Sequence, residues 1–338
     1  MWLSYVNSNR SCSHLNNPAE VVSDSILHTI GATPLVRLDR LVKACNVNGT
    51  ILAKLEYLNP GGSKKDRVAA EMISIAERNG VLTPGQTVVE ATSGNMGTAL
   101  AIVCSIWGYP FVAVMSEGNS IERRQMMEAF GAEVVLVEQG GREKSGMVSG
   151  DDFALVRLKA KRIAKERNAY WADQFSDAGS LAANQLLGKE VISQTKGKFD
   201  AFADILGSGG TFAGVSKAIK KFNPKIKCVA VEPQEANVLS NQKSSILPHP
   251  IQGVGYSISD LNFLKKCEFD SSLLVSGQEA KITAQKLARL EGIFAGYSSG
   301  ANVAAALKLL NGKFSGKTIV VIICDSGLKY LSTDLWKP

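Results

Sequence analysis

Two adjacent lysines follow a short apolar segment near the start of the chain. Residues 51–57 read ILAKLEY, and residues 59–67 read NPGGSKKDR. Two glycines let the backbone of this turn approach a ligand closely. A lysine held between a strand and a helix can lose its proton and attack a carbonyl carbon, as a Schiff-base lysine does. An ordinary turn with two solvated lysines accounts for the same residues.

Three more polar or glycine-rich segments stand at the ends of expected strands: residues 90–97 (EATSGNMG), 207–211 (GSGGT) and 325–327 (DSG). The first offers hydroxyls and backbone N–H groups to a carboxylate at a helix N-terminus, although plain helix capping explains it too. The second can form a backbone nest for a phosphate, or be a simple turn. The third places polar side chains at the end of a buried strand, where a capped turn is the other reading.

Together the four segments supply what an enzyme that uses pyridoxal phosphate needs. The needs are a lysine for the imine, an anchor for the amino-acid carboxylate, an anchor for the phosphate and a partner for the pyridine nitrogen. The combination is more specific than any one segment.

The elements that position these segments alternate between short apolar runs and helical stretches. We expect strands at 51–57, 87–91, 110–115, 132–138, 200–206, 226–232 and 317–324, and helices at 66–79, 96–107, 121–130, 152–167, 279–290 and 299–310. Such alternation predicts an α/β fold of two doubly wound lobes with mainly parallel sheets. Ligands in such folds bind at the carboxyl ends of the strands.

We expect a loose N-terminal tail over residues 1–20. A smaller lobe over 50–165 would carry the carboxylate loop and close on substrate. A larger lobe, made of 21–49 and 166–338, would carry the phosphate loop. The glycine-rich stretch 140–150 reads as a loop.

Composition excludes several classes of protein. The chain has 338 residues, 45% of them hydrophobic, and a net charge of +7 that is spread along the sequence, so we expect no nucleic-acid partner. Six cysteines without a CxxC pair and three histidines favour a reducing compartment and no metal site. The longest apolar run, 98–115, is interrupted at Gly108-Tyr109-Pro110, so we expect no membrane span. We predict a cytoplasmic protein, with a transit peptide at the Ser/Asn-rich start as the alternative.

From about Ser25 to Trp336 the chain resembles the fold-type II pyridoxal-phosphate enzymes, which are similar to the tryptophan synthase β subunit. Within that group it resembles the cysteine synthase (O-acetylserine sulfhydrylase) and cystathionine β-synthase family. Besides the segments above, the resemblance rests on IGATPL (30–35), IQGVG (251–255), GIFAG (292–296), SSGA (298–301) and YLST (330–333).

The resemblance implies a role for each matching residue. Lys65, directly before Asp66-Arg67, would form the Schiff base with pyridoxal 5'-phosphate. Asn95 would bind the ring hydroxyl oxygen and Ser326 the pyridine nitrogen. The phosphate would lie on Gly207, Ser208, Gly209, Gly210 and Thr211. The substrate would contact Thr92, Ser93, Gly94, Met96, Gln174 and Gly253.

The implied reaction is β-replacement through an aminoacrylate intermediate. The expected form is cysteine synthase, which makes cysteine and acetate from O-acetylserine and sulfide, in a homodimer. The substrates would be an amino acid and a thiol or sulfide. Alternatives are cystathionine, lanthionine or diaminopropionate formation, and cysteine desulfhydration.

Several residues depart from the family pattern and leave the substrate open. Lys64 takes a position that is usually aliphatic, and Met96 one that is usually Thr in the sulfhydrylases. Residues 176–179 replace an Asn-Pro-Ala-Asn run, Asn184 falls where a histidine is common, and Tyr256 and Tyr297 replace smaller residues.

Overall fold

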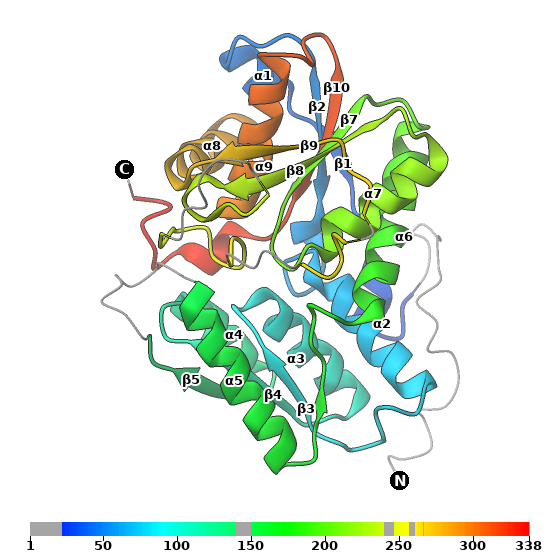
Figure 1. Ribbon diagram of the computed structural model, residues 1–338, viewed down its shortest axis with the longest axis vertical. Helices are drawn as coiled ribbons and strands as arrows, with labels where there is room; N and C mark the ends of the chain where they lie inside the picture. The colour runs from blue at the N-terminus through cyan, green and yellow to red at the C-terminus, as the bar shows by residue number, and fades with distance from the viewer. Residues whose placement is uncertain (1–21, 140–149, 240–246, 257–260, 266, 338) are drawn as a thin grey trace.

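A computed structural model describes residues 22–139, 150–239, 247–256, 261–265 and 267–337. Two sheets of mainly parallel strands stand one above the other in Figure 1, each with helices on both faces. Parallel strands joined by helices are buried on both sides, and this explains why they read as continuous apolar runs in the sequence.

The larger sheet has six strands in the order β1-β2-β10-β7-β8-β9. Only the pairing of β1 with β2 is antiparallel. The strands are β1 (Leu35–Arg37), β2 (Thr50–Leu55), β7 (Ala201–Ile205), β8 (Lys227–Pro233), β9 (Ser271–Val275) and β10 (Thr318–Ile323). Helices α1 (Asp39–Ala44), α8 (Gly277–Glu291) and α9 (Tyr297–Leu310) cover one face, and α6 (Ala178–Thr195) and α7 (Gly210–Phe222) cover the other.

The smaller sheet has four parallel strands in the order β5-β4-β3-β6. They are β3 (Val88–Ala91), β4 (Phe111–Ser116), β5 (Glu133–Val137) and β6 (Tyr170–Trp171). Helix α5 (Gly150–Glu166) packs on one face, while α3 (Asn95–Trp107) packs on the other between α2 (Lys65–Arg78) and α4 (Ile121–Ala129). Short 3-10 helices are η2 (Ile26–Thr29), η3 (Glu56–Leu58), η4 (Gln234–Ala236) and η5 (Gly327–Tyr330).

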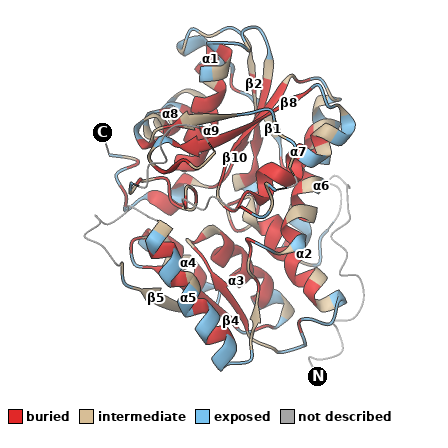
Figure 2. Ribbon diagram, in the orientation of Figure 1, coloured by how far each residue is buried: buried red, intermediate tan, exposed pale blue. Residues whose placement is uncertain are grey.

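The strands form the most buried layer of each lobe, as Figure 2 shows. One apolar cluster joins both faces of the larger sheet to α5 and the strands it covers. A second cluster lies between α2, α3 and the other face of the smaller sheet. Within the described ranges, no helix has both the length and the apolar character to cross a bilayer.

The expected α/β fold with two parallel sheets is confirmed, and the expected strands and helices lie within a few residues of those observed. The expected lobe boundaries, however, do not follow the sheets. Strand β2 belongs to the larger sheet, because it pairs with β10 along its whole length, and β6 belongs to the smaller one. The expected tail and most of the expected loop at 140–150 lie outside the described residues.

The contact between α8 and α9 depends on a glycine. Gly300 is buried in α9, and a Cβ at this position would overlap the carbonyl oxygen of Ala280 and lie 2.9 Å from the backbone nitrogen of Ala284. We expect Gly300→Ala to lower the free energy of unfolding by about 1–3 kcal/mol, since it overpacks the interface. Urea denaturation measures this. Gly312→Ala is the control, because the nearest atom lies 3.5 Å from its Cβ position. Equal effects of the two substitutions would contradict this packing account.

Candidate functional site

The candidate site is a pocket at the carboxyl ends of strands from both sheets. Residues directly after β3, β7 and β10 line it, together with two lysines at the start of α2, beyond η3. The lining includes eleven of the expected site residues: Lys65, Thr92, Ser93, Asn95, Met96, Gln174, Gly207, Ser208, Gly209, Thr211 and Gly253. It also includes Lys64, Ile205, Phe212, Gln252, Val254, Tyr256, Ser298 and Cys324, which the motifs did not single out as binding residues.

Lys65 is the first residue of α2, and its amine points into this pocket. Its Nζ donates a hydrogen bond of 2.8 Å to Oε1 of Gln174, which comes from the segment after β6. Burial and the nearby Lys64 ammonium lower the pKa of the Lys65 amine to about 8. At pH 7 about a tenth of this amine is therefore neutral, far more than of an ordinary lysine, and this fraction can act as a nucleophile or a base.

The loop after β3 turns sharply at Thr92 to begin α3. Thr92 Oγ1 accepts hydrogen bonds of 2.9 Å from the backbone N–H groups of Gly94 and Gly97. Gly94 itself lies behind the pocket with φ +128°, and any Cβ there would overlap the Arg123 side chain. The loop thus needs glycine at this position, and it presents Ser93 and Met96 to the pocket.

Asn95 is held from both sides. Its Nδ2 donates to Oδ2 of Asp325 at 2.7 Å, and its Oδ1 accepts from the buried Nζ of Lys329 at 2.9 Å. The Asp325 carboxylate also contacts Arg123 and accepts a bond from the Tyr330 hydroxyl. The Asn95 amide is therefore fixed in one orientation at the pocket wall, with a second N–H free of the Asp325 bond.

The glycine-rich loop after β7 leads into the N-terminus of α7. The N-cap of α7, Gly209 at φ +82°, has no side chain to cap the helix, and the Gly210 N–H makes a long bond of 3.4 Å to Ser208 Oγ. Gly207 also lines the pocket, and a Cβ there would lie 2.6 Å from the carbonyl oxygen of Gly253. Gly210 starts α7 against the hydroxyl of Ser180 and does not line the pocket. Uncapped N–H groups with two hydroxyls beside them, from Ser208 and Thr211, suit a phosphate.

The serine expected at the pyridine nitrogen is not among the residues that line the pocket. Ser326 lies outside the pocket lining, and its Oγ accepts the backbone N–H of Leu328 as the N-cap of η5. Ser298, in the first turn of α9, lines the pocket instead and is 5% exposed. The sequence signal for Ser298 was its place in the SSGA segment, at the start of a helix.

Three aromatic rings pack together next to the carboxylate loop, and one of them, Tyr256, lines the pocket. Tyr256 stacks on Phe153 with ring centroids 4.2 Å apart and meets Phe175 edge-on. The Tyr256 hydroxyl lies 2.9 Å from Oγ of Ser93, so a hydrogen bond crosses between the two lobes.

The other departures from the family pattern lie away from the pocket. Asp177 caps α6 through the Gly179 N–H, and Asn184 is buried within that helix. The Tyr297 hydroxyl donates to Asp334.

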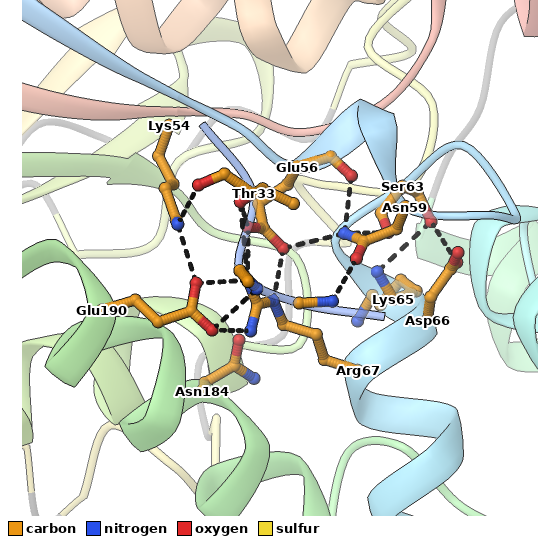
Figure 3. A network of polar contacts seen from close by, with 12 residues as sticks. Thr33, Lys54, Glu56, Asn59, Ser63, Lys65, Asp66, Arg67, Asn184 and Glu190 are labelled. Carbon is orange, nitrogen blue, oxygen red and sulfur yellow. Dashed lines mark hydrogen bonds and ion pairs between the residues drawn. The ribbon is translucent and has the colours of Figure 1, made fainter. Parts of the chain in front are cut away.

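A buried ionic network anchors the lysine loop (Figure 3). Arg67, two residues after Lys65, donates to Glu56 at 2.7 Å and to Glu190 at 2.6 Å. Asn59, in the loop before the lysines, donates to the same Glu56 carboxylate at 3.0 Å. Although burial opposes the charged form, Arg67 and Lys54 lower the pKa of Glu190 to about 2. The network fixes where α2 begins and so where its first side chains point.

The model of the family described as pyridoxal-phosphate dependent enzyme matches residues 26–325. The chain belongs to this family. The residues present fit the cofactor: Lys65 supplies an amine for its aldehyde, the uncapped N-terminus of α7 suits its phosphate, and Ser298 offers a hydroxyl to its ring nitrogen. The protein is thus a pyridoxal-phosphate-dependent enzyme.

Relatives of this enzyme catalyse β-replacement reactions on amino acids. A cysteine synthase of Staphylococcus aureus is 39% identical over 315 residues, which cover 93% of this chain and 97% of the relative. The crystal structure of O-acetylserine sulfhydrylase isoform 3 from Entamoeba histolytica has a TM-score of 0.84 at 36% identity, covering 96% of this chain and 95% of that one.

A third relative has another product in its name. The structure of the O-acetylserine-dependent cystathionine β-synthase from Helicobacter pylori has a TM-score of 0.85 at 30% identity, covering 94% of this chain and 99% of that one. The pyridoxal-phosphate-dependent β-replacement expected from the sequence is therefore supported at the level of the family.

Removal of Arg67 tests the anchoring network. We expect Arg67→Met to lower the free energy of unfolding by about 3 kcal/mol, because it leaves the buried Glu56 without its ion-pair partner and Glu190 with Lys54 alone. Because the pKa of Glu190 is lowered in the folded state, its pairing stabilises the fold fully above about pH 4.5, and the contribution is lost as the pH falls towards 2.

Urea denaturation at several pH values measures both effects. Arg78→Met is the matched control, since Arg78 pairs with Glu71 at the surface, where its side chain is 60% exposed. A loss no larger than in the control would show that the network is not what holds α2.

Proposed function

We propose that this enzyme is a cysteine synthase, which replaces the acetate of O-acetylserine with sulfide. The observation that carries the proposal is the Lys65 amine, which faces the pocket between a carboxylate loop on one lobe and an anion-binding helix end on the other. The cysteine synthase and sulfhydrylase relatives support the choice of substrates.

Pyridoxal phosphate, when bound, stabilises the negative charge that proton removal leaves on the α-carbon of an amino acid. In our proposal Lys65 binds the cofactor aldehyde covalently, and later its free Nζ takes the α-proton as general base. Its lowered pKa, about 8, favours this role. Gln174, which holds Nζ at 2.8 Å, keeps the amine directed into the pocket.

The other residues bind and orient. We propose that Asn95 donates its second N–H to the ring hydroxyl oxygen and that Ser298 bonds the ring nitrogen. The phosphate lies on Gly207, Ser208, Gly209, Gly210 and Thr211. The substrate carboxylate lies at Thr92, Ser93, Gly94 and Met96, with Gln174 and Gly253 opposite. Met96 fills its position with apolar volume where a hydroxyl is expected, and Tyr256 narrows the same side of the pocket.

A thiol larger than sulfide is the second candidate nucleophile. The likeness to the Helicobacter pylori enzyme favours homocysteine, which would give cystathionine. Incubation with O-acetylserine and either sulfide or homocysteine, with the products measured by mass spectrometry, tests both. Cysteine formation at the higher kcat/KM supports our proposal, and cystathionine formation at the higher value would replace it. No product from either would overturn both.

We also propose a cytoplasmic homodimer that binds no nucleic acid. The five cysteines in the described part of the chain are free thiols, as is usual in a reducing compartment. The family resemblance is the basis for proposing a homodimer. Light scattering of the purified protein measures the assembly, and a monomer would contradict this part of the proposal.

The role of Lys65 predicts a covalent cofactor bond. We expect Lys65→Ala to lose the visible absorbance of bound pyridoxal phosphate that borohydride removes, and to lower kcat by at least about a hundredfold, since a general base contributes that much. Lys43→Ala is the control, because Lys43 lies exposed on α1, away from the pocket. A borohydride-sensitive band that persists in Lys65→Ala would assign the bond to another lysine.

The two serines give a separate test of the cofactor site. We expect Ser298→Ala to weaken pyridoxal phosphate binding about fivefold to tenfold, as the loss of one hydrogen bond of about 1 kcal/mol predicts. Ser326→Ala, which removes a hydroxyl outside the pocket, should leave binding within about twofold. Equilibrium dialysis measures both dissociation constants. The opposite order would return the ring-nitrogen role to Ser326.

A further inference from the structure

Lys64 and Lys65 are adjacent in the chain and both line the pocket, yet their amines have different partners. Lys64 Nζ lies 3.0 and 2.9 Å from the two carboxylate oxygens of Asp204. Lys65 Nζ donates instead to the neutral amide oxygen of Gln174. A carboxylate stabilises an ammonium, whereas an amide oxygen does so much less, so the two amines are set up for different protonation states.

Asp204 stands in a strand that is otherwise apolar. Its side chain is fully buried on β7, beside Cys324 and α9, where Nδ2 of Asn302 donates to it at 2.8 Å. A buried ion pair adds little stability compared with apolar residues of the same volume. Stability therefore does not explain why a charged pair stands at this point of the pocket floor, and a role in the site does.

We propose that Lys64, held as an ammonium by Asp204, is a positioning residue that increases the neutral, reactive fraction of the neighbouring Lys65 amine. An ammonium has no lone pair, so Lys64 cannot itself attack the cofactor aldehyde. The pair thus selects which of two adjacent lysines forms the covalent bond. This inference rests on the role of Lys65 in our proposed function.

The surroundings of Lys65 agree with this assignment. Besides burial, the groups that act on the pKa of its amine are Lys64, Glu90 on β3, Asp204 on β7 and Cys324 after β10, and Lys64 has the largest effect of these four. Burial raises the pKa of Glu90 to about 8 and that of Cys324 to about 12, so both are largely uncharged at pH 7. For Lys64, burial lowers the pKa, but the charge and hydrogen bond of Asp204, together with Cys324, outweigh it and raise the pKa above its ordinary value.

Competitive labelling measures the two amines directly. The full chain, freed of cofactor, is treated with a trace of acetic anhydride between pH 6 and 11, and fragment mass spectrometry separates Lys64 from Lys65. In the wild type we expect Lys65 to become reactive near pH 8, while Lys64 stays unreactive until a much higher pH. Reaction of Lys64 at or below the midpoint of Lys65 would overturn the proposal without any variant.

Three variants separate charge from packing. Lys64→Met/Asp204→Asn removes both charges and leaves no buried carboxylate unpaired. It should move the Lys65 midpoint up by about one unit, which lowers the reactive fraction at pH 7 about tenfold. Lys64→Met should move it at least as far. Lys64→Arg keeps a cation at this position and should leave the midpoint nearly unchanged. A midpoint that stays in place in the double variant, or moves as far in Lys64→Arg, would show a purely structural role.

A second measurement follows the formation of the covalent bond with the cofactor. Each protein is mixed with pyridoxal phosphate, reduced with borohydride at a series of pH values, and digested. We expect the label on Lys65 alone, with a pH profile that follows the acetylation midpoint. If the midpoints shift as proposed but Lys65 carries no label, the proposed function fails while the role of Lys64 stands.

Discussion

The site depends on one constraint: each buried charge must keep a partner of opposite charge. Arg67 pairs with two carboxylates, Glu56 on η3 and Glu190 on α6, and it lies two residues beyond the reactive lysine. An ion in a poorly polarisable interior must be compensated at short range. This requirement fixes the start of α2 against both the larger sheet and α6. Because Lys64 and Lys65 lie at the start of α2, these contacts also fix their positions.

The same constraint acts at the pocket, where the lysine amines differ in the groups that face them. Asp204 compensates one ammonium, and an amide faces the other amine. Lys329 is buried between a backbone carbonyl and the Asn95 amide, and burial lowers the pKa of its amine to about 8. Three lysines thus differ in the protonation of their amines because different groups surround each Nζ.

Much of this arrangement follows from local sequence. The strands β3, β4, β7 and β10 were predictable because parallel strands buried on both faces are continuous apolar runs, and the binding loops because each follows such a run. Elements without that signal were missed. Strand β6 has two residues, β9 is half-buried, and α6 has apolar residues around much of its circumference because it packs on α2 and α7.

Ser326 shows the limit of such reasoning. The residue does follow a buried strand, but its hydroxyl caps η5, which is the local alternative that the sequence also allowed, and only the structure distinguishes the two. The Lys64–Asp204 pair joins residues 140 positions apart, and the sequence alone does not predict a contact over that separation.

The pocket loops after β3, β7 and β10 leave the carboxyl ends of their strands, and the turns that lead into β3, β4 and β5 contribute no residue to the pocket lining. Glycines occupy the turns there, at Gly85 before β3, Gly108 before β4 and Gly131 before β5, and no atom lies within 4 Å of a Cβ built at any of the three. These turns are the places where the chain can be lengthened, tagged or cut and rejoined in a new order. The fold thus separates the strand ends that carry the pocket from the strand ends whose turns can be altered.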